Sequence, residues 1–366
     1  MQISAMVVNE VGAPFTLVDV ELQDPAPDEV VVKIAGVGLC HTDIAVQHGH
    51  MPFPLPGVLG HEGSGTVVQV GSAVTTLAVG DQVAMSFNSC GSCPRCNIGE
   101  PANCHNFLAY NFGGARADGS SGLTKSGKPL GANFFGQSSL ATHALTLASN
   151  VVKLPAGTPL ELVGPLGCGV QTGAGAVMNS LDVRSETSIV IAGAGAVGIS
   201  AVMAAVVREA ATIIAVDLHE SRRALASEFG ATHTIDPTAG PLSEQVREIL
   251  PMGVDFALDT TAVAPVVEQL LASLGMKGVL GLLGVPANPE ATFAAGLMAA
   301  PLYGYTIKGI VEGDSVPQTF IPYLLELHSQ GKFPFDKLIT TMPLIQINEA
   351  IAGLHSGEIL KAVLIP

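Results

Sequence analysis

The chain has 366 residues, of which 48% are hydrophobic and only 13% are charged, and its formal net charge is −15. This length exceeds what one hydrophobic core normally serves, so we expect two domains. The apolar content excludes disorder, and the sparse charge predicts a homo-oligomer, dimer or tetramer, with surface buried between subunits. The acidic balance, with no basic run to offset it, argues against nucleic acid and anionic membranes as partners.

The N-terminal residues show no basic region followed by an apolar core, which argues against a secretory signal and predicts a cytoplasmic protein. Residues 189–207 carry no charge and are long enough to cross a bilayer. Three glycines, Gly193, Gly195 and Gly198, divide this stretch into a β-branched strand and a small-residue helix. We therefore expect a buried strand and helix rather than a membrane span.

The first part of the chain, up to about residue 153, is β-rich. Short apolar or alternating runs, separated by glycine and proline, predict strands at 30–34, 65–70 and 81–84. This texture suits a distorted β-barrel. The polar, glycine-rich segment 112–128 is expected to be the one long loop.

The middle of the chain alternates strands with helices. Strands are predicted at 188–192, 212–216, 256–259 and 278–283, and helices begin at Ser221 and Ala264. Such a βαβ series predicts a doubly wound parallel sheet. The remainder, with a helix over 319–330 and a strand over 362–365, is expected to return to the first domain.

Four of the six cysteines lie within fifteen residues, at positions Cys90, Cys93, Cys96 and Cys104. This spacing lets four thiolates converge on one ion at about 2.3 Å, as in structural zinc sites. The other interpretations are two disulfides, which need an oxidising compartment, or four ordinary buried thiols. A zinc ribbon alone could also bind nucleic acid, but the surrounding sequence is not basic.

The two remaining cysteines, Cys40 and Cys168, lie far apart. A catalytic zinc needs three protein ligands and one open position, and these ligands can come from distant loops. His61 is the best placed histidine because it precedes a glycine-punctuated strand. On spacing alone these three residues are only a candidate site, since buried cysteine usually acts as a small hydrophobe.

A glycine-rich motif follows the strand at 188–192 and opens a helix, and Asp217 ends the next strand. In this context the glycines admit a pyrophosphate to backbone N–H groups, while the carboxylate accepts hydrogen bonds from the adenosine ribose. A carboxylate there repels a 2′-phosphate, so NAD is predicted over NADP. The motif comprises Gly193, Ala194, Gly195, Ala196, Val197 and Gly198.

These motifs resemble, in order and along nearly the whole chain, the zinc-containing medium-chain alcohol dehydrogenases. The resemblance is carried by Gly60-His61-Glu62 with its following glycines, Cys40-His41-Thr42-Asp43, the four-cysteine lobe and the glycine-rich motif. It implies a GroES-like catalytic domain over 1–168 and 312–366, a distorted β-barrel carrying two zinc ions. It also implies a Rossmann NAD-binding domain over 169–311, with a doubly wound parallel sheet.

The resemblance also implies the catalytic groups. Cys40, His61 and Cys168 would bind the catalytic zinc, with Glu62 close behind as an occasional ligand, and Asp43 would orient His61. Thr42 matches the position that accepts the alcohol proton. Many relatives end this relay in a histidine where this chain has Ala45, so His48 or water would have to complete it.

Further residues match family positions that contact the coenzyme. His41 and Lys361 would bind the pyrophosphate, Arg222 would meet the adenosine ribose, and Thr172 would pack beside the nicotinamide. Each of these four would, without the positional match, be interpreted as a solvated or capping residue.

The segments 111–116 and 134–139 resemble the aryl (benzyl-type) alcohol dehydrogenases, which predicts a flat apolar primary alcohol, aromatic or allylic, as the substrate. The alternatives are aliphatic alcohols or S-(hydroxymethyl)glutathione, and more distantly a non-catalytic protein that binds zinc and NAD. Met51 is apolar where the glutathione-dependent subgroup has a polar residue. The expected pocket residues are Met51, Phe87, Phe134, Phe135, Val285 and Val311, and Val285 is also expected to contact the coenzyme.

Overall fold

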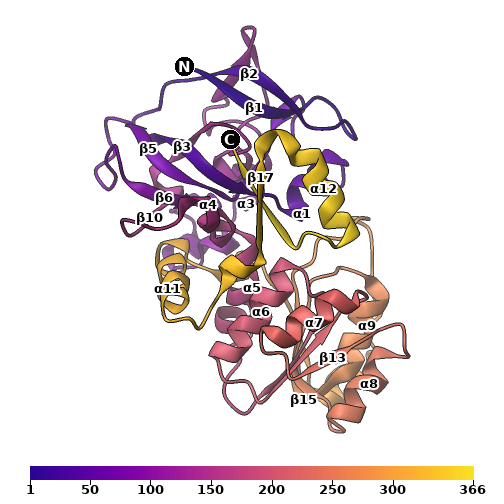
Figure 1. Ribbon diagram of the computed structural model, residues 1–366. Coiled ribbons are helices and arrows are strands. Elements are labelled where there is room, and N and C mark those ends of the chain that lie inside the picture. Colours follow the sequence, from indigo (N-terminus) through magenta and orange to yellow (C-terminus); the bar gives the residue numbers. More distant parts are fainter. The chain divides into compact units, whose positions relative to one another are not determined.

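The computed structural model describes residues 1–366 and divides into two compact units (Figure 1). The first comprises Met1–Gly169, Val316–Glu326 and Phe335–Pro366, so the two ends of the chain belong to the same unit. The second comprises Val170–Ser315 and Leu327–Pro334. Neither unit is one continuous stretch of sequence.

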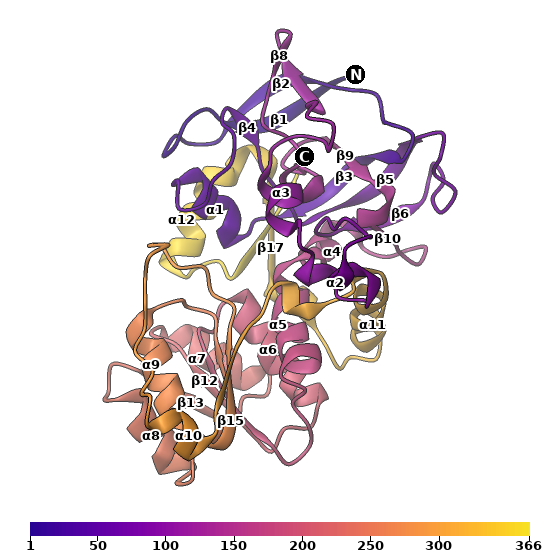
Figure 2. The same ribbon diagram turned by 180° about the vertical axis from the view of Figure 1, so that it is seen from behind.

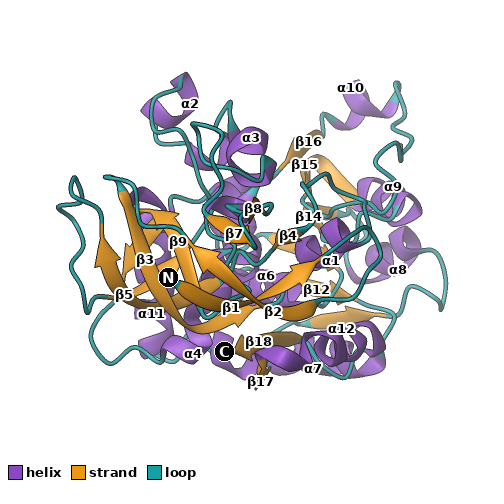
Figure 3. Ribbon diagram, turned by 90° about the horizontal axis from the view of Figure 1, so that it is seen from above, coloured by secondary structure: helices purple, strands orange, loops and turns teal.

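The first unit is built on two β-sheets, whose strands are orange in Figure 3. One is antiparallel and contains, in spatial order, β4 (Gly57–Val58), β1 (Gln2–Val8), β2 (Thr16–Leu22), β7 (Leu123–Lys125) and β8 (Lys128–Pro129). The other contains β10 (Val151–Lys153), β6 (Gln82–Met85), β5 (Gly63–Val70), β3 (Glu29–Gly38), β18 (Lys361–Ile365) and β17 (Ile339–Pro343), with β9 (His143–Leu147) paired to β3.

Strand β3 is the centre of the second of these sheets. Its valines, Val30, Val31 and Val32, are completely buried, and its ladder with β5 shifts register between Ile34 and Gly36, which bends the strand. A Cβ on Gly65 of β5 would lie 1.9 Å from the Lys33 carbonyl oxygen, so only glycine fits there. The expected β-rich first region is confirmed. The strands β1 and β2 were not predicted from the sequence.

The second unit contains a six-stranded parallel sheet. Its spatial order is β13 (His233–Ile235), β12 (Thr212–Val216), β11 (Ser188–Ala192), β14 (Val254–Asp259), β15 (Leu274–Leu282) and β16 (Thr306–Gly309). The chain therefore starts in the middle of the sheet, works to one edge, and returns to build the other half. The doubly wound parallel sheet is confirmed.

Helices complete both units. The first contains α1 (His41–Gln47), α2 (Pro94–Asn97), α3 (Phe107–Phe112), α4 (Leu160–Val163) and α12 (Ile347–Ser356). In the second, α8 (Leu242–Ile249) and α9 (Ala264–Ser273) pack on each other (Figure 2), and α8 buries Leu242 and Val246, one turn apart. Its helices are α5 (Gly169–Gly175), α6 (Ala196–Val207), α7 (Glu220–Glu228), α8 (Leu242–Ile249), α9 (Ala264–Ser273) and α10 (Ala299–Tyr303), while α11 (Pro317–Ser329) belongs partly to each unit.

The expected single loop over 112–128 is wrong in part. Helix α3 extends to Phe112, and β7 and β8 form a hairpin near the other end. Between them, the Arg116 guanidinium donates from Nε and Nη2 to the two carboxylate oxygens of the buried Glu29, each at 2.9 Å. This two-pronged contact ties the segment to β3, an interaction that turn-forming residues in the sequence could not indicate.

None of the helices combines the length and apolar character needed to cross a bilayer. The uncharged stretch 189–207 is strand β11, buried at every position, followed by helix α6.

Candidate active site and metal centres

Residues from three distant segments form the first cluster. The ligand atoms of Cys40, His61, Glu62 and Cys168 lie within 4.8 Å of one another. Cys40 caps the N-terminus of α1, His61 and Glu62 precede β5, and Cys168 follows the 3₁₀ turn Gly164–Gly167. The structure thus brings together all four residues that the sequence analysis singled out.

Asp43 orients the imidazole of His61. Its completely buried carboxylate lies 3.2 Å from His61 Nδ1 and accepts hydrogen bonds from the backbone N–H groups of Gly60 (2.9 Å) and Cys40 (3.0 Å). His61 Nε2 is buried and makes no hydrogen bond of ordinary geometry within the protein. An imidazole nitrogen held in this way, beside two thiols, fits a tetrahedral zinc site.

The charges in this cluster favour a Cys40 thiolate beside a protonated His61 imidazolium. A hydrogen bond from the Cys168 thiol lowers the pKa of Cys40 well below its usual value, and His61 acts in the same direction although burial opposes both. Burial disfavours the imidazolium, but the carboxylate of Asp43 and the sulfur of Cys40 outweigh it and raise the pKa of His61. A divalent cation would replace the proton that these ligands otherwise share.

The carboxylate of Glu62 is held in place by Lys361 and by the backbone of Gly169. Lys361 Nζ lies 2.5 Å from one carboxylate oxygen, and the other accepts the Gly169 N–H at 3.0 Å. Burial raises the pKa of Glu62 to about 6, against the pull of the Lys361 ammonium. A Cβ on Gly38 would lie 1.9 Å from the carboxylate, so glycine is required there. Lys361, expected to contact a pyrophosphate, is itself buried on Glu62 and on the Leu39 carbonyl at 3.1 Å.

A strained turn around Phe134–Gly136 supports His61 from another side. Asn133, Phe135 and Ser138 have left-handed backbone conformations, with φ of 58°, 50° and 49°. Such conformations are costly without glycine and persist where the surroundings enforce them. Gln137 in this turn donates from Nε2 to the His61 carbonyl oxygen at 2.9 Å and accepts the Gly63 N–H at 3.1 Å. No sequence pattern indicates this role of Gln137.

The predicted pocket phenylalanines lie against the metal cluster. The ring of Phe135 stacks on the His61 imidazole with centroids 4.4 Å apart, and Phe134 meets it edge-on at 5.3 Å. Both phenylalanines are buried, as is Phe87. Met51 packs at the edge of the same core. Further rings, those of Phe53, Phe107 and Phe112, complete the aromatic cluster around them.

The expected relay residues belong to α1. The Thr42 hydroxyl oxygen lies 3.7 Å from the Cys40 sulfur, and His41 is exposed at the start of the helix. His48 is exposed at its end, where Nδ1 lies 2.9 Å from the Ile44 carbonyl oxygen. Ala45 is buried. No contact joins Thr42 to His48 among these interactions, so the path of a proton beyond Thr42 stays a prediction.

The four-cysteine lobe forms the second cluster, and its ligand atoms also lie within 4.8 Å of one another. Sulfur pairs are 3.6 to 4.0 Å apart, too far for a disulfide at about 2.05 Å, and all the cysteines are free. Backbone N–H groups of Ser92 and Cys93 lower the pKa of Cys90 to about 5. Burial instead raises the pKa of Cys96 to about 12 and also raises the pKa of Cys104. The convergence of four sulfurs is what fits structural zinc.

The glycine-rich motif forms the turn between β11 and α6. Gly193 has a φ of +90°, and a Cβ on Gly198 would lie 1.7 Å from the Gly193 carbonyl oxygen. At Gly195, by contrast, an added Cβ would meet nothing within 4 Å. Gly193 is therefore needed for the turn, and Gly198 is needed for the close packing of helix on strand. Gly195 leaves the backbone open to a ligand. Ala196 and Val197 are the first residues of α6.

Asp217 at the end of β12 closes this site. One oxygen accepts the Ala194 N–H of the glycine-rich turn at 2.8 Å, and the other accepts the His219 N–H at 2.9 Å. Arg222 Nη1 lies 3.9 Å from the carboxylate. Arg223, which the sequence analysis missed, donates to the Asp217 carbonyl oxygen at 2.8 Å. An acidic side chain beside an open glycine turn fits a dinucleotide whose ribose carries free hydroxyls.

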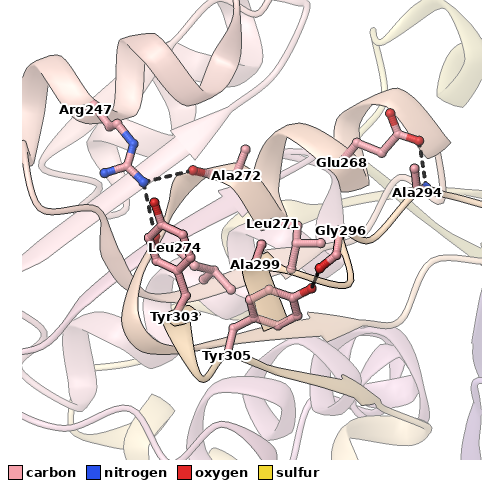
Figure 4. Close-up of a pocket in the computed structure, with 10 residues that line it drawn as sticks. All are labelled: Arg247, Glu268, Leu271, Ala272, Leu274, Ala294, Gly296, Ala299, Tyr303 and Tyr305. Atoms are coloured by element: carbon pink, nitrogen blue, oxygen red, sulfur yellow. Dashed lines mark hydrogen bonds between the residues drawn. The ribbon is translucent and has the colours of Figure 1, made fainter. Parts of the chain in front are cut away.

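The other predicted coenzyme contacts lie in the second unit. Thr172 is half-buried in α5, and Val285 is half-buried after β15. Val311, after β16, is exposed. A cavity of about 340 Å³ in the same unit shares no residue with the glycine turn (Figure 4). Its charged groups, Arg247 and Glu268, are bonded to backbone groups, and we assign it no function.

Comparison with known proteins agrees with this geometry. The profile of the alcohol dehydrogenase GroES-like domain matches residues 26–156, and that of zinc-binding dehydrogenases matches residues 196–329. A geraniol dehydrogenase of Castellaniella defragrans is 47% identical over 363 residues, which cover 99% of this chain and 97% of that protein. The chain belongs to the zinc-containing medium-chain alcohol dehydrogenases. The expected pairing of a GroES-like domain with a Rossmann domain is confirmed.

Two solved structures of this alcohol dehydrogenase family superpose over the whole chain. An alcohol dehydrogenase zinc-binding domain protein from Burkholderia ambifaria has a TM-score of 0.97 at 49% identity, covering 100% of this chain and 99% of its own. Benzyl alcohol dehydrogenase from Acinetobacter calcoaceticus has a TM-score of 0.97 at 43% identity with the same coverage. The protein is therefore an oxidoreductase for small-molecule alcohols.

Proposed function

We propose that this enzyme oxidises primary benzyl-type or allylic alcohols to aldehydes, reversibly, with NAD as hydride acceptor. The observation that carries the proposal is the aromatic wall on the metal site: Phe135 stacked on His61, with Phe134 edge-on beside it. Flat apolar substrates suit such surroundings. The names of two relatives, a geraniol dehydrogenase and a benzyl alcohol dehydrogenase, point to the same substrate class.

We further propose two zinc ions per chain, one on Cys40, His61 and Cys168 and one on the four-cysteine lobe. The first supplies a Lewis acid that makes the alcohol hydroxyl acidic near neutral pH. The protein's own residues do the rest. Asp43 fixes the orientation of His61, Gln137 fixes its backbone, and Thr42 accepts the hydroxyl proton and passes it toward solvent. The carbon-bound hydrogen leaves the alcohol as a hydride.

The preference for NAD over NADP rests on Asp217. Its buried carboxylate, held on the glycine turn, would repel a 2′-phosphate. The same proposal keeps His41, Arg222, Thr172, Val285 and Lys361 as coenzyme contacts, although Lys361 must then serve Glu62 as well. A homo-oligomer, dimer or tetramer, remains part of the proposal because so little of the chain is charged.

A steady-state screen tests the substrate and the coenzyme together. Benzyl alcohol, geraniol, ethanol and S-(hydroxymethyl)glutathione are compared with NAD and with NADP. The proposal expects kcat/KM for the first two alcohols to exceed that for ethanol by about a hundredfold, the scale of hydrophobic discrimination. It also expects at least about a tenfold preference for NAD.

Two outcomes of this screen would contradict the proposal. A best rate with ethanol or the glutathione adduct would favour the aliphatic or glutathione-dependent alternative. If Asp217→Ala leaves the ratio of kcat/KM with NAD to kcat/KM with NADP unchanged, Asp217 does not bind the ribose.

A further inference from the structure

We propose that Gln137 is a positioning residue that sets the selectivity of this enzyme among alcohols, because it holds the aromatic wall at a fixed separation from the metal ligands. The inference rests on the proposed function, since it assumes that the alcohol binds a metal ion on Cys40, His61 and Cys168. It assigns to a buried amide a task beyond its support of the His61 backbone.

The turn that carries the aromatic wall has a backbone conformation that most of its residues disfavour. Four of the six residues in 133–138 are left-handed, namely Asn133, Phe135, Gly136 and Ser138, and only Gly136 adopts this conformation freely. The other three keep it only where their surroundings enforce it. The contacts that enforce the turn therefore also fix the ring of Phe135, which stacks on the His61 imidazole.

These contacts run to the segment that leads into the metal ligand His61. The Ser138 hydroxyl donates to the Val58 carbonyl oxygen at 2.6 Å. The backbone N–H of Ser139 donates to the Gly60 carbonyl oxygen at 2.9 Å. The turn and the segment 58–60 are thus bonded side by side, so a displacement of one displaces the other.

The Gln137 side chain, which is 1% exposed, extends this connection to His61 itself. Its Nε2 donates to the carbonyl oxygens of His61 at 2.9 Å and Ser86 at 3.2 Å, and its Oε1 accepts the Gly63 N–H at 3.1 Å. Two acceptors face the nitrogen and one donor faces the oxygen, so the orientation of the amide is defined. An apolar side chain of similar size would leave these buried backbone groups without this partner.

The contact with Ser86 reaches the segment of a second metal ligand. The Ser86 hydroxyl donates to the Gly167 carbonyl oxygen at 2.6 Å, and Gly167 directly precedes Cys168. Ser86 also directly precedes the buried Phe87, one of the expected pocket residues. One amide thus connects the turn of the aromatic wall with the segments of two ligands, His61 and Cys168.

A fixed separation between metal and wall favours flat, rigid alcohols. Such an alcohol is held at two points, with its oxygen at the metal and its apolar part against the wall. Because its shape cannot adapt, both contacts form together only when the wall stands at the matching distance. Ethanol presents little apolar surface to the wall and depends mainly on the metal. Loosening the wall should therefore weaken the reaction of benzyl alcohol more than that of ethanol.

The variant Gln137→Met tests this inference, because it removes all three hydrogen bonds of the side chain and keeps its approximate length. Gln47→Met is the matched control, since Gln47 is another buried glutamine of the first unit, whose Nε2 donates to the Ala13 carbonyl oxygen at 2.9 Å. For wild type and both variants, kcat/KM is measured with benzyl alcohol and with ethanol on fully zinc-loaded enzyme. The zinc affinity of the catalytic site is measured by competition with a chelator.

In Gln137→Met we expect the ratio of kcat/KM for benzyl alcohol to that for ethanol to fall about tenfold, mainly through a higher KM for benzyl alcohol. Zinc affinity should also fall about tenfold, because the segments of two ligands lose a common support. Gln47→Met should leave both quantities within about twofold of wild type, since it breaks a single contact outside the site.

The outcomes separate this inference from the proposed function. If wild-type enzyme shows no preference for benzyl alcohol over ethanol, the proposed substrate class fails, and the inference fails with it. If wild type has the preference and Gln137→Met retains it, or Gln47→Met reduces it equally, only the role of Gln137 is overturned.

A loss of zinc affinity without a change in the selectivity ratio also overturns the inference, because Gln137 would then serve the metal alone. Gln137→Asn carries the same amide on a shorter side chain that cannot reach all three partners. It should lower the selectivity ratio in the same direction, and it takes the place of Gln137→Met if that variant does not fold.

Discussion

The two cysteine clusters reach similar geometries by different routes. The four-cysteine lobe draws its ligands from residues 90–104, and its sulfurs are arranged largely by backbone N–H groups of the same segment. The Cys40–His61–Cys168 site draws on three segments and depends on side chains behind the ligands, including Asp43 and Gln137. A local site needs only correct spacing, whereas an assembled site needs a buried second layer to hold each ligand.

Replacing a ligand of the assembled site should have the largest effect. Cys168→Ser is expected to lower kcat/KM at least about a thousandfold, because a catalytic zinc supplies several kcal/mol of stabilisation. Elemental analysis should find one zinc per chain instead of two, and circular dichroism should match wild type. Near-normal turnover in this variant would remove Cys168 from the catalytic site.

Thr42→Ala should separate chemistry from metal retention in the assembled site. Thr42 lies beside Cys40 without contributing a ligand in the proposed site. Loss of the proton acceptor should slow kcat/KM about a hundredfold, within the usual range for general-base catalysis, while the zinc content stays at two. Thr42→Ser keeps the hydroxyl and serves as the control. Full activity in Thr42→Ala would overturn the proton path.

Asp43→Asn tests whether the second layer holds the metal. The amide keeps the size of the side chain but loses the charge that faces His61 and two backbone N–H groups. Zinc affinity of the catalytic site should fall about tenfold to hundredfold, measured by competition with a chelator. Asp19→Asn, on the exposed face of β2, is the matched control. An unchanged affinity would show that the ligands alone define this site.

Cys93→Ser should act on stability rather than on chemistry. Opening the local cluster removes metal-binding energy that is part of folding, so the melting temperature should fall by about 5 °C. Turnover per folded molecule should stay close to wild type. A variant with two zinc ions and an unchanged melting temperature would contradict the assignment of the lobe.

Arg95→Ala should have the smallest effect. The pair of Arg95 with Glu100 spans 2.8 Å but is about half exposed at both partners, and such pairs contribute at most about 1 kcal/mol. The zinc content should not change, and the melting temperature should move by no more than about 2 °C. Release of zinc from this variant would mean that a side-chain contact, not the backbone, organises the lobe.

The sequence predicted the elements that local patterns specify. Three consecutive β-branched residues in an uncharged run before a glycine turn identify β11, and the alternation of strands and helices that follows specifies the parallel sheet. The strands β1 and β2 were not predicted, because polar residues such as Ser4, Asp19 and Glu21 interrupt their apolar runs. The segment 112–128 was predicted as one long loop because nothing in its composition indicates Glu29, the partner of Arg116 far upstream.

The site residues likewise fall into those that local sequence patterns predict and those that they do not. Ligand types and their spacing pointed to both cysteine clusters, and the glycine motif pointed to the dinucleotide turn. Gln137, the Lys361–Glu62 pair and the contact of Ser86 with Gly167 could not be found because their partners lie far away in sequence. Polar residues with buried, long-range partners leave no periodic signal, so only the folded chain identifies them.

The contact between Lys361 and Glu62 also bears on when this protein can acquire activity during its synthesis. The four-cysteine lobe is complete once residue 104 has left the ribosome. Lys361 joins β3 and Glu62 only after its strand, β18, pairs with β3 at Val37 and Gly38. Because chains emerge at about 5–20 residues per second, the two clusters would mature many seconds apart. A nascent chain could thus hold its first metal long before the pocket for the second is finished.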